Sequence, residues 1–261
     1  MRSACLMLLF AFAVPAAASE EKYPTGFNDT PIIPGTKWHV HDGDRPHAPV
    51  VKPGDQPGQP PSDAIVLFDG RNLDAWESSK GGGARWKVQD GYAEVVPDSG
   101  DIVTKRKFGD YQLHLEFREP SPPTGKSQER GNSGVYLAGL YEVQILDSYD
   151  NVTYADGQAS AIFGQTPPLA NASRPPGEWQ SYDIVFETPR FAADGKVVSP
   201  GYVTVLHNGV LTQNHTALLG PATFHALPTW KPHGGEMPLK LQDHEMLVRF
   251  RNIWLRPLAD R

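Results

Sequence analysis

The stretch RWKVQDGYAEVV, residues 85–96, decides the fold class of this chain. Apolar and polar residues alternate on both sides of its central Asp90-Gly91 pair, and a period of two is typical of β-strands. An Asp-Gly pair between two such runs favours a tight hairpin, because both turn residues must adopt positive φ. The stretch therefore predicts two antiparallel strands joined by a two-residue turn.

The same pattern continues from Ala64 to the C-terminal end of the chain. Asn208-Gly209 marks a second tight hairpin. Further alternating runs are AIVLFDG, GDIVTKRKF, YQLHLEFRE, SGVYLAG, YEVQILD, SAIFGQ, WQSYDIVFET and MLVRFRNIWLRPL. No window keeps apolar residues at helical spacing over three turns. About a dozen strands without a convincing helix predict an all-β domain, a sandwich or jelly roll of antiparallel sheets.

The N-terminal sequence, MRSACLMLLFAFAVPAAASEEK, is typical of a secretory signal peptide. We expect cleavage near Ala18, and export to the periplasm or exterior of a bacterium. The apolar run is shorter than the roughly 20 residues that span a membrane, and no later segment is longer, so no stable membrane anchor is predicted. The only cysteine, Cys5, lies within this segment, so the mature domain is expected to fold without disulfides.

Residues 19–62 are dense in Pro and Gly and show no periodicity, which predicts an extended arm or linker before a domain at 63–261. The formal net charge is −6, and loss of Arg2 with the signal peptide takes it to −7. An acidic chain without a basic patch argues against a nucleic-acid partner.

Polar side chains on the stretch LYEVQILDS, residues 140–148, suggest a functional site. Glu142 and Gln144 share one face of the predicted strand, and Asp147 follows before a turn. The flanking runs NSGVYLAG and SAIFG are poor in charge, so we expect a central strand whose polar face forms the floor of a cleft. A solvated outer face is the alternative. The long loops 120–132 and 166–178 are also expected to be functional, because compact sandwiches rarely keep idle loops of that length.

A second polar cluster lies in LQDHEMLVRFRNIWLRPL, residues 241–258. Gln242 and His244 alternate onto one face, and a His beside the carboxylate of Asp243 can be tuned for acid–base work. Arg249 offers a guanidinium fork that suits sugar hydroxyls. A comparable polar face in YQLHLEFRE is interpreted as a solvated outer surface; it comprises Gln112, His114, Glu116 and Arg118.

Other motifs of catalysis and metal binding are missing from the sequence. The H-x-H pair in HVHD, residues 39–42, has no second cluster at zinc-like spacing, and no Gly-x-Ser-x-Gly elbow occurs. The sequence requires no cofactor, and it leaves open whether the protein needs a divalent cation.

Six motifs in order resemble the 3-keto-disaccharide hydrolase domain, from about Ile65 to Leu258. They are LFDGRNLDAW (67–76), GNSGVYL (131–137), YEVQILDS (141–148), GEWQSYDIVF (177–186), LHNGV (206–210) and LQDHEMLVRFRNIWLRPL (241–258). The resemblance implies a concanavalin-like jelly roll with a carbohydrate cleft on its concave face. It also implies an exported enzyme that cleaves the glycosidic bond of a sugar already oxidised at C3.

Such chemistry needs a base near C2, an acid near the leaving oxygen and groups that polarise the ketone. On the matching positions, the resemblance implies Glu142 as the base and His244 as the partner acid/base. Asp147 and Asp243 are expected to orient His244 or hold a cation. The substrate-binding residues are expected to be Gln144, Gln242, Arg249, Asn132, Tyr136 and Trp230.

Two other functions stay open at this point. Glu142-x-Gln144-x-x-Asp147 has the spacing of the E-x-D-x-x-E strand of retaining jelly-roll β-glucanases, although Gln in the middle and the shorter Asp weaken that match. A non-catalytic, lectin-like module is the second alternative. In that case the sugar-stacking platforms would come from Trp76, Trp86, Trp179 and Trp230, with Trp230 the most exposed of them.

Overall fold

The structure, a computed structural model, describes residues 25–258. The predicted signal peptide lies outside these residues. The chain forms two compact units, one ending at Val50 and one beginning at Val51. In the first unit, a β-bridge joins Ile32 to His39. Residues 51–62 of the predicted arm therefore belong to the same unit as the β domain.

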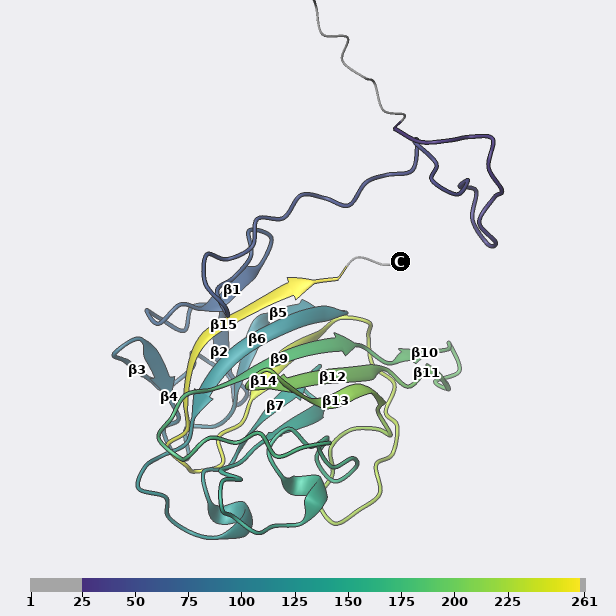
Figure 1. The fold of residues 1–261 in the computed structure, drawn as a ribbon. Coiled ribbons are helices and arrows are strands. Elements are labelled where there is room, and N and C mark those ends of the chain that lie inside the picture. Colours follow the sequence, from purple (N-terminus) through teal and green to yellow (C-terminus); the bar gives the residue numbers. More distant parts are fainter. Residues whose placement is uncertain (1–24, 259–261) are drawn as a thin grey trace, which may run out of the picture. The chain divides into compact units, whose positions relative to one another are not determined.

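The second unit is a sandwich of two antiparallel sheets, which confirms the predicted all-β jelly-roll fold (Figure 1). The larger, eight-stranded sheet has the order β13-β12-β9-β6-β15-β4-β3, with β1 also paired to β15. Its strands are β1 (Ile65–Phe68), β3 (Lys87–Gln89), β4 (Tyr92–Glu94), β6 (Tyr111–Arg118), β9 (Gln180–Glu187), β12 (Tyr202–His207), β13 (Val210–Ala217) and β15 (Arg249–Pro257).

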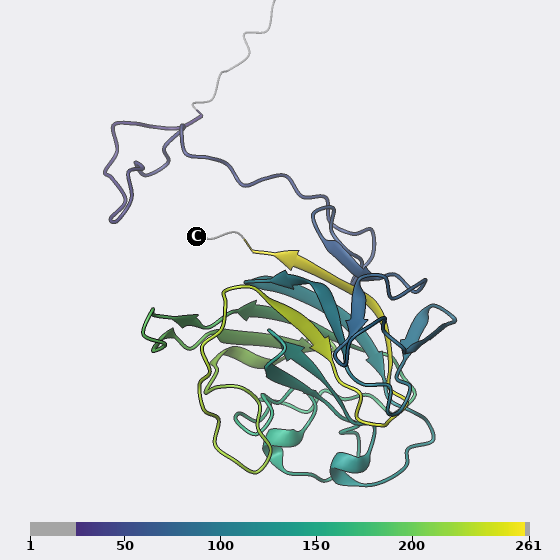
Figure 2. The same ribbon diagram turned by 180° about the vertical axis from the view of Figure 1, so that it is seen from behind.

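The five-stranded sheet has the order β2-β5-β14-β7-β8. Its strands are β2 (Trp76–Ser78), β5 (Ile102–Phe108), β7 (Ser133–Leu137), β8 (Tyr141–Ile145) and β14 (Met237–Leu241). A small ribbon pairs β10 (Arg190–Phe191) with β11 (Val197–Ser199), and two 3-10 turns complete the elements, η1 (Ser127–Glu129) and η2 (Ala155–Gly157). Both views place these turns on the same side of the domain as the long loop between β13 and β14 (Figures 1 and 2).

Both hairpins expected from the sequence are confirmed. Asp90 and Gly91 have φ of 47° and 79°, and Asn208 and Gly209 have φ of 51° and 80°. Positive φ at both central residues is the geometry that matches the twist of the flanking strands. The turns accordingly join β3 to β4 and β12 to β13.

The core lies between the two sheets, where alternate residues of each strand point inward. On β6 these are Leu113, Leu115 and Phe117, and all three are buried. Trp76 and Trp86 are buried in the same core, so neither can serve as a sugar-stacking platform.

The expectation that β8 is a central strand is wrong, because β8 is the last strand of its sheet. Its free edge is covered by residues 160–163. The backbone N–H of Gln144 donates to the carbonyl of Ala161 (3.0 Å), and the N–H of Phe163 donates to that of Glu142 (3.1 Å). The low charge of the flanking run SAIFG therefore reflects burial against an edge and not membership of a further strand.

The outer face of the larger sheet is less solvated than the sequence suggested. The carbonyl of Gly58 accepts hydrogen bonds from Asn252 Nδ2 and Trp254 Nε1, both at 2.8 Å. His114 lies beneath Gly58 and is only 3% exposed, with its Nδ1 2.7 Å from Asp183 Oδ1. Residues 51–62 thus include a strap that is fixed to this face. Separately, no helix within residues 25–258 is long and apolar enough to cross a membrane.

Candidate active site

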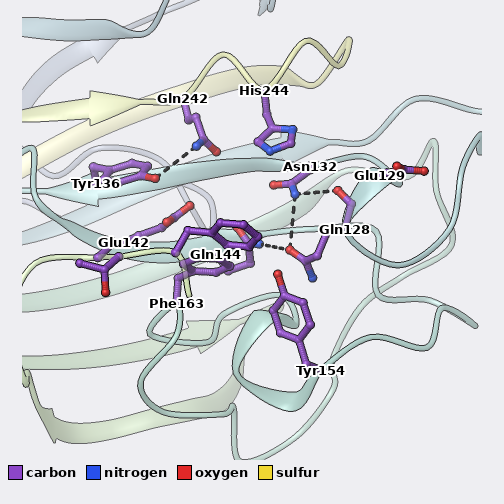
Figure 3. A pocket seen from close by; sticks show the side chains of 13 residues that line it. Gln128, Glu129, Asn132, Tyr136, Glu142, Gln144, Tyr154, Phe163, Gln242 and His244 are labelled. Atoms are coloured by element: carbon purple, nitrogen blue, oxygen red, sulfur yellow. Dashed lines mark hydrogen bonds between the residues drawn. The ribbon is translucent and has the colours of Figure 1, made fainter. Parts of the chain in front are cut away.

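A pocket of about 360 Å³ opens on the face of the five-stranded sheet that points away from the core (Figure 3). Because side chains alternate along β8, Tyr141, Val143 and Ile145 enter the core while Glu142 and Gln144 face the pocket. The volume lies within the range of small-ligand sites. The pocket is lined by Gln128, Glu129, Asn132, Tyr136, Glu142, Gln144, Tyr154, Phe163, Ala222, Thr223, Phe224, Gln242 and His244.

Glu142 is the second residue of β8 and is 4% exposed. A Cβ built on Gly134 would lie 2.3 Å from Glu142 Oε1, so the carboxyl group has room only because residue 134 is glycine. Burial raises the pKa of Glu142 to about 7, while hydrogen bonding to Tyr136 and the charge of Lys240 act to lower it. A carboxyl group that titrates near neutrality can both accept and return a proton.

Tyr136 is the cross-strand partner of Glu142. Its hydroxyl accepts a hydrogen bond from Gln242 Nε2 at 3.2 Å, and the Lys240 Nζ lies 3.8 Å from the centre of its ring. Burial raises the pKa of Tyr136 far above its usual range. The hydroxyl therefore keeps its proton and is a permanent donor beside the carboxyl group.

A chain of amides fixes the orientation of Gln144, which is 1% exposed. Gln144 Nε2 donates to Gln128 Oε1 (2.9 Å), and Gln128 Nε2 donates to the Gly157 carbonyl (2.9 Å). Gln144 Oε1 and Gln242 Oε1 have no hydrogen-bond partner among residues 25–258. A buried acceptor without a donor costs about 1–3 kcal/mol, and sugar hydroxyls are donors that would satisfy it.

The remaining walls come from loops. Figure 3 shows Gln242 and His244 entering from one side of the pocket and Tyr154 from the other, whereas the Glu129 carboxylate points away from the group. Sequence reasoning missed Tyr154, together with Gln128, Phe163 and Phe224. The length of loop 120–132 was the one signal for Gln128, and an aromatic residue in the polar stretch NVTYADG was a weak signal for Tyr154.

His244 is exposed at the rim, and neither predicted carboxylate orients it. Asp243 accepts hydrogen bonds from the backbone N–H groups of Gly100 (2.8 Å) and Glu245 (3.0 Å). Its carboxylate therefore shapes the loop after β14 and does not hold the imidazole. This corrects the expectation drawn from the adjacent residues in the sequence.

Asp147 also lies outside the pocket. Its Oδ2 accepts a hydrogen bond from Arg130 Nε at 2.6 Å, and its side chain is 1% exposed. The alternation that places Glu142 in the pocket ends with β8 at Ile145, so it does not extend to residue 147. The expectation that Asp147 orients His244 is thus corrected, because Asp147 is paired with Arg130 outside the pocket.

Arg249 and Trp230 are the other two predicted residues that the structure places elsewhere. The chain crosses from the five-stranded to the eight-stranded sheet after β14, so Arg249 lies on the other sheet, where it pairs with Glu94. Trp230 packs against the core, with its ring 6.2 Å from that of Tyr141. Neither side chain lines the pocket: Arg249 follows the crossing to the other sheet, and Trp230 is taken up by packing against the core.

One buried carboxyl group provides a useful contrast to Glu142. Glu119 is fully buried and accepts hydrogen bonds from Gln180 Nε2 at 3.0 and 2.9 Å. Burial raises the pKa of Glu119 to about 8, yet this residue does not line the pocket. Within the described part of the chain, no group of three or more His, Cys, Asp or Glu residues is arranged to hold a metal ion. The question of a divalent cation, which the sequence leaves open, is untested.

Comparisons with known proteins agree with this geometry. The family model of the 3-keto-alpha-glucoside-1,2-lyase-like domain matches residues 63–256. The chain is 48% identical to a presumed glycosyl hydrolase from Parabacteroides distasonis, with a TM-score of 0.80 over 87% of this chain and 100% of that one. A second presumed glycosyl hydrolase from the same organism is 22% identical, with a TM-score of 0.55 over 76% of this chain and 94% of that one, and supports the fold alone. No curated protein matches the sequence significantly.

Proposed function

Because the chain belongs to the family of 3-keto-alpha-glucoside-1,2-lyase-like domains, we propose that it cleaves 3-keto-glycosides by elimination across C1 and C2, followed by hydration. Family membership makes it a carbohydrate-active protein. The finer proposal rests on Glu142, a buried carboxyl group whose pKa is raised to about 7. It faces a pocket in which two amide oxygens have no partner among residues 25–258.

In the proposed reaction Glu142 transfers the C2 proton, and His244 transfers the proton of the leaving oxygen and of the attacking water. The C3 ketone acidifies the C2 proton, which the Glu142 carboxylate removes. The electron pair forms the C1=C2 bond as the C1–O bond breaks, and His244 protonates the leaving oxygen. Water then adds to C1 while His244 takes its proton, and Glu142 returns a proton to C2. The net change is hydrolysis, and both residues recover their starting states.

The pocket supports this assignment through the polarity of its walls. Gln144 Oε1 and Gln242 Oε1 offer acceptors for sugar hydroxyls, while the Tyr136 hydroxyl is a donor for an oxygen that gains charge. Preorganised donors of this kind stabilise an enolate as it forms. Asn132 adds a side chain that is held to Gln128, with Nδ2 2.7 Å from the Gln128 carbonyl.

The first test compares a 3-keto-glucoside with its unoxidised parent, with and without a chelator. We expect turnover of the oxidised sugar alone, because only its C2 proton is acidic. In D₂O the released 3-keto-sugar should carry deuterium at C2, which mass spectrometry detects. The free 3-keto-sugar incubated in the same buffer controls for spontaneous exchange. Turnover of the unoxidised sugar only contradicts the proposal.

The retaining-glycosidase alternative is tested by Asp147→Asn. That mechanism needs a second carboxylate in the cleft, but Asp147 is paired with Arg130 outside it. We expect kcat/KM within about threefold of wild type and a loss of about 1–3 kcal/mol in the free energy of unfolding, because a buried ion pair is broken. Urea denaturation and steady-state kinetics measure both quantities. A loss of activity of about a thousandfold in the folded variant would favour the alternative.

A further inference from the structure

A second cavity, of about 230 Å³, adjoins the active-site pocket. The two share a wall formed by Tyr154, Phe163, Thr223 and Phe224. The second cavity also has Asp156, Gly164, His225 and Ala226 in its lining, but none of the polar residues on the sheet floor. A ligand that spans both cavities would therefore place one part over Glu142 and another among aromatic rings.

We propose that the second cavity is a leaving-group subsite that prefers an aromatic aglycone. Four of its eight lining residues carry rings: Tyr154, Phe163, Phe224 and His225. Aromatic pairs at centroid separations of 4.5–7 Å stabilise each other beyond the area they bury. The inference rests on the proposed function, because it takes the sugar in the first pocket to be the part that is cleaved from this aglycone.

The aromatic wall is held in place by the chain around it. A Cβ on Gly157 would lie 2.1 Å from the Tyr154 ring, so this ring packs directly on a glycine backbone. The Phe163 N–H donates to the Glu142 carbonyl, which ties this ring to the strand that carries the base. Tyr154 and Phe163 meet edge to face, with ring centres 6.4 Å apart.

Phe224 forms the accessible side of the subsite. It stacks on His225 with ring centres 3.8 Å apart, and it is 67% exposed. An exposed phenyl ring over a cavity offers stacking surface to a bound ring. Because so much of Phe224 is exposed, its truncation should not disturb folding. Leu227, in the same loop and more exposed, lines neither cavity and serves as the matched control.

The experiment compares benzyl and methyl 3-keto-α-glucosides, whose leaving alcohols have similar acidity, so that binding and not leaving-group chemistry sets the difference. We expect wild type to favour the benzyl substrate in kcat/KM. Phe224→Ala should lower that preference about tenfold, while Phe224→Trp and Leu227→Ala keep it. Thermal melts confirm that each variant is folded.

Three results would overturn the inference in different ways. If Phe224→Ala turns over both substrates and keeps the preference for benzyl, the second cavity is not a leaving-group subsite, and the proposed function still holds. If wild type favours a glucosyl aglycone over benzyl and Phe224→Ala lowers that preference, the subsite binds a sugar and not an aromatic aglycone. No turnover of any 3-keto-glucoside by wild type overturns the proposed function and this inference together.

Discussion

Glu142→Gln should abolish turnover and, at pH 8, make the folded protein more stable. Loss of the proposed base is expected to lower kcat by about a thousandfold or more. The stability effect arises because the folded-state pKa of about 7 lies above the ordinary value of 4.5. The folded protein therefore pays for a charged, buried carboxylate at high pH, which the neutral amide avoids.

The pH window follows from the same raised pKa. Below pH 4.5 the carboxyl group is protonated in both the folded and unfolded states, so its contribution to stability is complete there. That contribution is lost as the pH rises through about 7, because Glu142 ionises in the unfolded state near pH 4.5 but in the folded state only near pH 7. Wild type should thus lose up to about 3 kcal/mol across this window relative to the Gln variant, as measured by urea denaturation at pH 5 and pH 8. Wild-type kcat/KM should rise with pH through about 7.

Glu119→Gln is the matched control for Glu142→Gln. Glu119 is also buried and its pKa is also raised, to about 8, but it lies outside the pocket. Its replacement should change the pH dependence of stability while activity persists. Equal losses of activity in the two variants would contradict the proposal that Glu142 is the catalytic base. A lectin-like module gives a different result again, namely binding of the sugar by wild type and both variants without turnover by any of them.

Gly134→Ala should lower kcat about a hundredfold without removing any functional group. The new methyl group would lie 2.3 Å from Glu142 Oε1 and 2.9 Å from the Tyr136 ring, so the carboxyl group must move. A displacement of about 1 Å in a catalytic group can cost that much in rate. Steady-state kinetics at saturating substrate measures the effect.

Gly235→Ala provides the comparison for the Gly134 variant. Gly235 has open space around its Cβ position, so the same change should leave kcat near wild type. Thermal melts of both variants separate misplacement from unfolding. Full activity in folded Gly134→Ala would show that the carboxyl position in the structure is not the one used in catalysis.

The part of the site that the sequence predicts is the part carried by regular strands. Alternation fixes which face a side chain occupies, and the structure brings Glu142, Gln144 and Tyr136 together on one face of β7 and β8. Turn chemistry is equally local, so both hairpins were predictable. Asp147 and Arg249 were misplaced because each lies beyond a point where a strand ends or the chain changes sheets.

The aromatic wall was not predictable for a different reason. Tyr154, Phe163 and Phe224 lie in loops without periodicity, and their positions depend on contacts between segments distant in sequence. Gln128 is similar, because its role comes from bonds to Gln144 and Gly157 across the fold. Single-sequence patterns contain no such distances.

The edge position of β8 separates the strand contacts that hold Glu142 from the loop that lines the second cavity. One side of β8 is in register with β7, which holds Glu142 over Gly134. The other side is bonded to residues 160–163, which belong to the loop that carries Tyr154 and Phe163. Insertions or substitutions in that loop can reshape the second cavity without shifting the β7–β8 register. The proposed aglycone subsite can therefore vary in sequence while Glu142, the proposed base, stays in place.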